Sequence, residues 1–353
     1  MDKNNNYPEY IESIYEFKVP QGQTPQRLDI YLVNNIKNAT RTKVQKAISE
    51  GVVTINGKVT RGSKKVQPGD LIICKLLKPP PIELIPEDIP LNIIYEDDYL
   101  MLVNKPSGMV SHPGFGNRSG TLVNALLFHL GHRERIKIEI DEDEEEINDE
   151  GKIFASDSIR PGLVHRLDKD TSGIMLIAKN PDIHSLLAKQ FADRSVEKKY
   201  LALVWGKFDE PQGRIEGDIG RSNLDRKLFA VVKKGGKPAI TEYKVVDEFQ
   251  YVSLVEVNLL TGRTHQIRVH FSHIKHPVFG DVQYGGDKII YGYNNKKLKD
   301  LYNECLKLTR SQQLHSFSLR FEHPILKKSM KFEAELPQLF SELISKLKKS
   351  QFL

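Results

Sequence analysis

Closely spaced prolines divide this chain into two parts. Five of them fall within twelve residues: Pro79, Pro80, Pro81, Pro86 and Pro90. Proline lacks the backbone N–H that a helix interior or a central strand needs, and consecutive prolines favour an extended segment. We therefore predict a stiff connector over residues 79–90, between a small domain at 16–78 and a larger one at 91–340. The length of 353 residues agrees with this division, because single cores rarely exceed about 250–300 residues.

Positive charge is concentrated in the front part. Residues 16–78 contain 12 Lys and Arg but 4 Asp and Glu, whereas residues 139–150 contain 9 acidic residues and no basic one. The acidic insertion, residues 138–151, has no pattern that could form a core, and we expect a solvated loop there. A basic surface outside this loop favours a polyanionic partner, most simply nucleic acid. Solubility alone is the alternative explanation of the charge.

The front part has the pattern of two helices followed by a hairpin. We predict helices over 27–35 and 40–50, the second capped by Thr40 and followed by Gly51. Asn56-Gly57 between two apolar runs is a strong signal for a two-residue hairpin turn. The second helix carries three cationic side chains that could contact a phosphate backbone: Arg41, Lys43 and Lys46.

The larger part is predicted to be rich in β-structure. Its apolar segments are short and polar loops separate them. We expect strands over residues 99–106, 163–168, 173–180, 200–206, 251–260 and 317–323. One clear helix begins after Asn180, which can cap it, with Pro181 at its first position. Mostly β-structure with a few packed helices gives an α+β fold class.

Two polar segments could carry chemistry. The loop HRLDKDTSG (165–173) lies between two apolar strands, which makes it a rigid support for polar groups. Its two aspartates, Asp168 and Asp170, could form a paired-carboxylate hydrolase site, although Asp170 also fits a turn. The segment 264–277 contains four histidines, which raises a zinc hypothesis. Histidines that form hydrogen bonds at a helix surface are the simpler interpretation.

Several motifs in this chain, taken together, resemble a known family. The loop HRLDKDTSG looks like the signature of the RluA-type pseudouridine synthases, and further blocks follow in the family's order. These blocks are VNKPSGMVSHPG (103–114), GTLVNALL (120–127), GLVHRLDKDTSGIMLIAKN (162–180), EKKYLALVWG (197–206), LLTGRTHQIRVHFSHIKHPVFGD (259–281) and QLHSFSLRFEHP (313–324). The front part resembles the S4 RNA-binding domain, although Thr40 to Lys43 replace the family's usual Ser-Arg-Ser. The whole chain is similar to the RluC/RluD kind of large-subunit uridine synthase.

The resemblance implies an RNA isomerase and assigns roles to residues. In this family the C1′–N1 bond of a uridine breaks and the uracil is rejoined through C5, so no cofactor is needed. Asp168 matches the catalytic aspartate and Arg268 matches the basic residue that pairs with it. Tyr200 matches the tyrosine that stacks on the base, and Arg166 matches the residue that fills the space left by the extruded nucleotide. Whether Asp168 acts as nucleophile or base stays open, and both roles need the ionised form.

The resemblance also implies a fold and a cellular setting. It predicts a mixed, mainly antiparallel sheet with flanking helices, preceded by an S4-like RNA-binding domain. We expect isomerisation of uridines in large-subunit (23S) ribosomal RNA by a monomer that needs no metal. Transfer RNA as substrate, a non-catalytic assembly factor and a metal-dependent hydrolase are the alternatives. The chain has two cysteines, no apolar run that could span a bilayer and no signal-like start, so we expect a cytoplasmic protein.

Overall fold

The structure, a computed structural model, consists of two compact units, which we treat separately. It describes residues 11–36, 39, 41–78, 82–113, 117–138, 162–222, 224–225, 227–309 and 311–349. The first unit covers the chain up to residue 82 together with 137–144, and the second covers 83–136 and 145–353. Thr40, the prolines at 79–81 and all of the acidic insertion except Ile138 lie outside the described residues.

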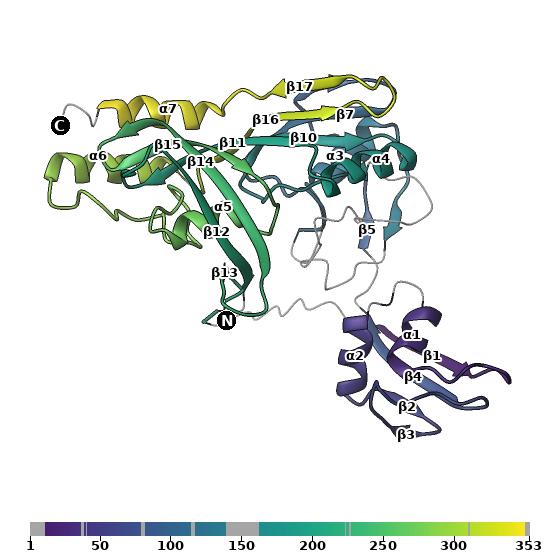
Figure 1. The fold of residues 1–353 in the computed structure, drawn as a ribbon. Helices are drawn as coiled ribbons and strands as arrows, with labels where there is room; N and C mark the ends of the chain where they lie inside the picture. The colour runs from purple at the N-terminus through teal and green to yellow at the C-terminus, as the bar shows by residue number, and fades with distance from the viewer. Residues whose placement is uncertain are drawn as a thin grey trace, which may run out of the picture. The chain divides into compact units, whose positions relative to one another are not determined.

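The first unit contains two helices and a four-stranded antiparallel sheet (Figure 1). The elements are β1 (Ile11–Lys18), α1 (Leu28–Asn35), α2 (Arg41–Ser49), β2 (Val53–Ile55), β3 (Lys58–Val59) and β4 (Leu71–Lys78). The predicted turn is confirmed: Asn56 and Gly57 have φ of 51° and 76°, and the Asn56 side chain accepts a hydrogen bond from the Leu71 N–H. β1 pairs with β4 along its whole length, so this unit begins before the expected start at residue 16.

One long sheet forms the centre of the second unit. Its strand order is β13-β12-β14-β15-β11-β16-β10-β7-β6, with β17 added on β16 and β9 on β10. The strands are β6 (Ile93–Glu96), β7 (Leu100–Lys105), β9 (Gly162–Leu163), β10 (Ser172–Ala178), β11 (Glu197–Trp205), β12 (Gln212–Arg221), β13 (Phe229–Val231), β14 (Lys237–Phe249), β15 (Val252–Leu259), β16 (Leu314–Glu322) and β17 (Ser329–Glu333). Two further strands, β5 (Ile82–Leu84) and β8 (Ile136–Ile138), pair with each other.

The sheet is mixed and mainly antiparallel, as predicted. The exception is β10, which runs parallel to β16 where Gly173 lies opposite Ser316. Gly173 has φ of 113°, and a Cβ there would lie 2.2 Å from the Ser316 carbonyl oxygen. Only glycine lets the two backbones approach this closely. This contact fixes the start of β10, directly after the loop that carries Asp168.

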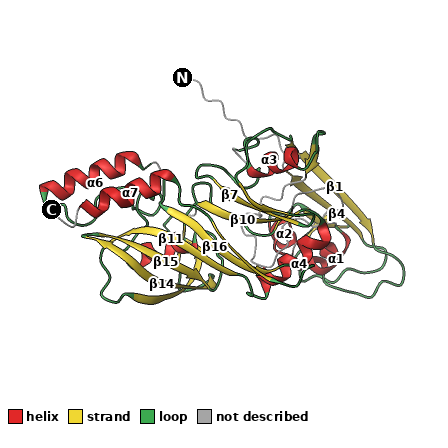
Figure 2. Cartoon of the chain, turned by 90° about the horizontal axis from the view of Figure 1, so that it is seen from above, coloured by secondary structure: helices red, strands yellow, loops and turns green. Residues whose placement is uncertain are grey.

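In the part of the chain that the structure describes, five helices accompany this sheet: α3 (Leu122–His129), α4 (Pro181–Ala192), α5 (Gln266–His273), α6 (Lys296–Leu308) and α7 (Gln338–Lys348). α4 begins as predicted, with the Asn180 side chain accepting a hydrogen bond from the Ile183 N–H at 2.9 Å. In Figure 2, α6 and α7 lie side by side at one end of the sheet. They cover a core around Trp205 that the sequence analysis did not anticipate. α5 packs against β12, β13 and β14 and thereby brings Arg268 to the sheet.

The strand expected over residues 163–168 is wrong beyond Leu163. β9 ends at Leu163, and residues 164–171 form the loop that leads into β10. Apolar Val164 and Leu167 are buried here, but they pack from a loop and not from a strand. The run of apolar residues predicted burial correctly and backbone conformation incorrectly.

Candidate active site

The loop that carries Asp168 is held by a buried lysine. Lys105, on β7, is 1% exposed and donates hydrogen bonds to the carbonyl oxygens of Pro106, Met109 and Lys169 at 2.9, 2.8 and 3.0 Å. Burial lowers the pKa of Lys105 to about 8, although the two aspartates of the loop oppose this. The Thr171 N–H also bonds to the Asp168 carbonyl oxygen at 3.1 Å and closes the turn. Asp168 therefore projects from a fixed backbone.

Arg268 joins Asp168 to a second, fully buried carboxylate. Its Nη1 donates to Asp168 Oδ2 at 3.0 Å, while its Nε and Nη2 bond to the two oxygens of Asp281 at 2.7 and 2.9 Å. Nη2 also donates to Gln283 Oε1 at 2.6 Å. Asp281 in turn accepts the backbone N–H groups of Gln283 and Tyr284. Asp281 thus orients the guanidinium toward Asp168.

Positively charged neighbours keep Asp168 in its charged form. Burial alone would raise the pKa of the Asp168 carboxyl, but His265, Arg268 and the hydrogen bond from Arg268 together hold it below its ordinary value. Burial lowers the pKa of His265, whose Nε2 lies 3.8 Å from Asp168 Oδ2, so its imidazole is mainly neutral at pH 7. Arg268 is therefore the permanent cation beside this carboxylate.

The Tyr284 ring lies against the guanidinium of Arg268. Its ring centroid lies 4.9 Å from the Arg268 guanidinium carbon, and its hydroxyl is 2.9 Å from His265 Nδ1. An aromatic face stabilises a guanidinium that has left water. Tyr284, His265 and Arg268 consequently form one wall against which the Asp168 carboxylate is placed.

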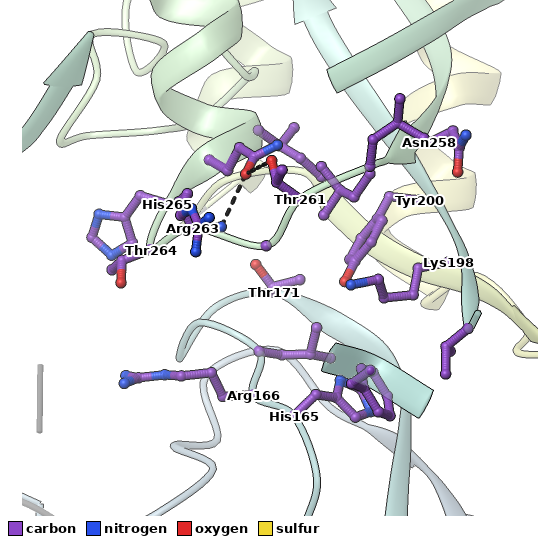
Figure 3. Close-up of a pocket in the computed structure, with 18 of the residues that line it drawn as sticks. His165, Arg166, Thr171, Lys198, Tyr200, Asn258, Thr261, Arg263, Thr264 and His265 are labelled. Atoms are coloured by element: carbon purple, nitrogen blue, oxygen red, sulfur yellow. Dashed lines mark hydrogen bonds between the residues drawn. The ribbon is translucent and has the colours of Figure 1, made fainter. Parts of the chain in front are cut away.

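A cavity of about 720 Å³ opens in front of Asp168. Figure 3 shows its walls: the Asp168 loop with His165 and Arg166, Lys198 and Tyr200 from β11, and residues 261–265 before α5. This volume is in the range of small-molecule sites and is large enough for a nucleoside. Six of its lining side chains are Arg or Lys and two are acidic, so the lining suits an anionic ligand. The basic ones are Arg166, Arg194, Lys198, Lys237, Arg263 and Arg268.

The structure brings together four residues that the sequence analysis selected. Asp168, Arg166, Tyr200 and Arg268 all line this cavity, and Tyr200 is 6% exposed on β11. Arg166 is exposed at the cavity, two residues before Asp168. The alternative partner of Asp168, Asp170, does not line it.

Two of the four histidines of 264–277, His270 and His276, have structural roles, whereas His265 lines the cavity. His270 lies 2.9 Å from the Thr241 hydroxyl, and His276 Nδ1 lies 2.7 Å from the Trp205 carbonyl oxygen and stacks on Phe208. Among the described residues, no three His, Cys, Asp or Glu side chains are arranged to hold a metal ion. The geometry therefore favours hydrogen-bonding histidines over the zinc hypothesis.

Sequence reasoning missed several supports of this site. Asp281 ends the block 259–281 and Gln283 and Tyr284 follow it, but their order along the chain does not show that a turn folds them onto Arg268. Lys105 belongs to another block, and nothing in its neighbourhood signals a buried lysine. Only the tertiary structure identifies these partners.

In the first unit, the predicted cations lie on one helix. Arg41 and Lys46 are exposed on α2, and the side chain of Lys43 lies outside the described residues. Buried Asp29 accepts hydrogen bonds from the guanidinium groups of Arg27 and Arg41, the latter at 3.3 Å. These bonds hold the pKa of Asp29 well below its usual range. The carboxylate positions both arginines at the surface.

Comparison with known proteins identifies the family. The sequence profile of RNA pseudouridylate synthases matches residues 99–273, and that of the S4 domain matches residues 26–72. A Chlorobaculum parvum protein named as an RNA pseudouridine synthase is 44% identical over 94% of this chain and 96% of its own. The ribosomal large subunit pseudouridine synthase D of Zymomonas mobilis is 39% identical over 88% of this chain and 90% of its own.

A solved structure has the same fold. Human RNA pseudouridylate synthase domain containing 4 covers 73% of this chain and 93% of its own, with a TM-score of 0.53 and 23% identity. The matching profile and relatives define the class as an RNA-modifying isomerase, with which the fold and the pocket carboxylate agree. The chain belongs to the RluA-type family of RNA pseudouridine synthases. Within the described residues, no helix has the length and apolar character needed to cross a bilayer.

Asp281→Asn tests the positioning of Arg268. Without the second charge, the guanidinium is free to turn away from Asp168, so we expect kcat to fall about tenfold or more while RNA affinity changes little. Asp300→Asn, at an exposed position on α6, is the matched control and should behave as wild type. Turnover and RNA binding are measured on both variants to test whether Asp281 positions Arg268. Full kcat in Asp281→Asn would show that Arg268 keeps its orientation without Asp281.

Proposed function

We propose that the chain converts uridines of large-subunit ribosomal RNA to pseudouridine, using Asp168 as the catalytic group. The observation that carries this proposal is the 3.0 Å bond between Arg268 and Asp168 at a cavity lined by cations. The large-subunit assignment rests on full-length relatives that carry this substrate in their names. The substrate is a uridine that has turned out of the RNA helix, because the enzyme cannot reach C1′ of a stacked nucleotide.

The reaction exchanges one bond of the nucleoside for another. The C1′–N1 bond breaks, the uracil turns and C5 bonds to C1′; C5 then loses its proton and N1 gains one, so no external reactant is consumed. Asp168 acts at the sugar, either as nucleophile at C1′ or as base, and in both roles its lone pair must be free of a proton. Arg268 supports both by keeping the carboxylate ionised and oriented.

Two further residues act on the base and on the RNA around it. Tyr200 is buried in the cavity wall on β11, where its ring can stack on the uracil while the base turns. Arg166 is exposed on the Asp168 loop, and its planar guanidinium can occupy the space from which the nucleotide was extruded. Neither role needs a metal or cofactor.

The first unit supplies affinity for RNA. Arg41, Lys43 and Lys46 on α2 contact the phosphate backbone, which adds binding energy without reading sequence. The protein works in this account as a cytoplasmic monomer. Transfer RNA as substrate and a purely structural assembly role are the competing functions, and the experiment below separates both from the proposal.

Asp168→Asn tests the proposed chemistry. The amide keeps the shape of the carboxyl but cannot act as nucleophile or base, so we expect loss of isomerisation with RNA affinity nearly unchanged. A strain that lacks the protein is complemented with wild type, Asp168→Asn or the control Asp170→Asn, and pseudouridines are mapped in its RNA. Wild type and Asp170→Asn should restore a modified uridine in large-subunit RNA.

Three outcomes of this mapping would contradict the proposal. Restoration by Asp168→Asn removes Asp168 from the chemistry. A site that appears only in transfer RNA overturns the ribosomal substrate, and restored ribosome assembly without any modified uridine favours the assembly factor.

Arg41→Ala, Lys43→Ala and Lys46→Ala together test the role of the first unit. Each phosphate contact removed should reduce the slope of log affinity against log salt by about 0.9, because fewer counterions are released. Turnover at saturating RNA should persist. Lys331→Ala, on β17 of the second unit, serves as control and should keep the wild-type slope. An unchanged slope in the triple variant would exclude these residues from the RNA contact.

A further inference from the structure

Thr171 has a buried hydroxyl with no partner in the described chain. The residue is 2% exposed, and its Oγ1 makes no hydrogen bond with any described residue. The neighbouring buried hydroxyl of Ser172 is satisfied, with its Oγ 2.9 Å from His315 Nδ1. A buried polar group that lacks a partner costs about 1–3 kcal/mol, so such groups are rare unless a ligand completes them. The contrast between adjacent residues singles out Thr171.

This hydroxyl lies in the wall of the active-site cavity. Thr171 lines the cavity together with Asp168, and in Figure 3 its oxygen lies between the segment of His165 and Arg166 and the segment of Thr261 and Arg263. The Thr171 N–H bonds to the Asp168 carbonyl oxygen, so both side chains project from one closed turn. The hydroxyl and the catalytic carboxylate therefore belong to one turn at the cavity.

Neighbouring side chains have their own partners. Thr261 Oγ1 donates to Gln266 Oε1 at 2.8 Å and accepts the Ile240 N–H at 2.9 Å. Arg268 Nη1 is directed at Asp168, and its other nitrogens are directed at Asp281 and Gln283. These described neighbours therefore leave Thr171 Oγ1 without a partner, and a molecule that enters the cavity can supply one.

We infer that Thr171 is a substrate-contacting residue, whose hydroxyl forms a hydrogen bond with the extruded uridine. The inference rests on the proposed function, since it takes a uridine nucleoside as the occupant of the cavity. A hydroxyl can donate or accept, and the nucleoside presents both hydroxyl and carbonyl groups. The bond orients the nucleoside over Asp168 at no cost in side-chain ordering, because Thr171 is already fixed in the free protein.

Thr171→Val and Thr171→Ser separate the hydroxyl from the methyl group. Valine keeps the shape and removes the hydroxyl, so we expect kcat/KM to fall about tenfold or more while Tm stays equal to or above that of wild type. Serine keeps the hydroxyl and should retain most of the activity. Thr241→Val is the matched control for stability: its hydroxyl is buried and accepts a hydrogen bond from Gln266 Nε2, so its removal should lower Tm.

The measurement uses the full chain and ribosomal RNA from a strain that lacks the protein, with pseudouridine formation as the readout. Activity of Thr171→Val within twofold of wild type would overturn the inference, and so would an equal loss in Thr171→Ser. A Tm of Thr171→Val that falls as far as that of Thr241→Val would show that the hydroxyl has a partner in the free protein, which also overturns it. Wild type that forms no pseudouridine in this RNA would contradict the proposed function instead.

Discussion

The guanidinium of Arg268 lies between two carboxylates, buried Asp281 on one side and Asp168 at the cavity on the other. Each of its nitrogens has a carboxylate or amide oxygen as partner, which is the condition under which a buried cation is tolerated. Asp281 holds the Arg268 guanidinium in place, and the guanidinium in turn orients the Asp168 carboxylate and favours its ionised form. Without this cation, less positive charge would oppose burial, which raises the pKa of the Asp168 carboxyl and favours the protonated form that has neither of the proposed catalytic roles.

The fold serves this interaction from two directions. Lys105 and the turn closed by Thr171 hold the backbone on which Asp168 stands, and Gly173 brings β10 against β16 immediately behind it. α5, packed on β12, β13 and β14, delivers Arg268 from a segment a hundred residues further along the chain. Arg268 sits on a helix, and the loop that carries Asp168 is fixed at both ends by β9 and β10 and by the bonds from Lys105, so the separation of the two partners depends on the sheet.

Features that depend on local sequence could be predicted, whereas those that depend on the packing of distant segments could not. Asn56-Gly57 and Asn180-Pro181 specify their turn and helix start by local chemistry, and both are confirmed. The motif loop indicated Asp168 as a candidate site residue. The apolar residues Val164 and Leu167 are buried but lie in a loop, so the strand predicted beyond Leu163 was wrong. Asp281 and Lys105 could not be predicted as partners, because their roles arise only when distant segments pack. The core that α6 and α7 cover around Trp205 was missed for the same reason.

The ionised state of Asp168 can be measured directly by carbon-13 NMR titration of the aspartate carboxyls, with Asp168→Asn used to assign the signal. We expect a pKa below the ordinary 3.8 in wild type, so that the carboxylate and the stability it lends persist as pH falls and are lost only when pH falls through that lower pKa. In Arg268→Gln, which keeps hydrogen bonds but loses the charge, the pKa should rise above the wild-type value, because less positive charge then opposes the effect of burial. The same pKa in both proteins, or a wild-type value above 3.8, would contradict the claim that Arg268 keeps Asp168 charged.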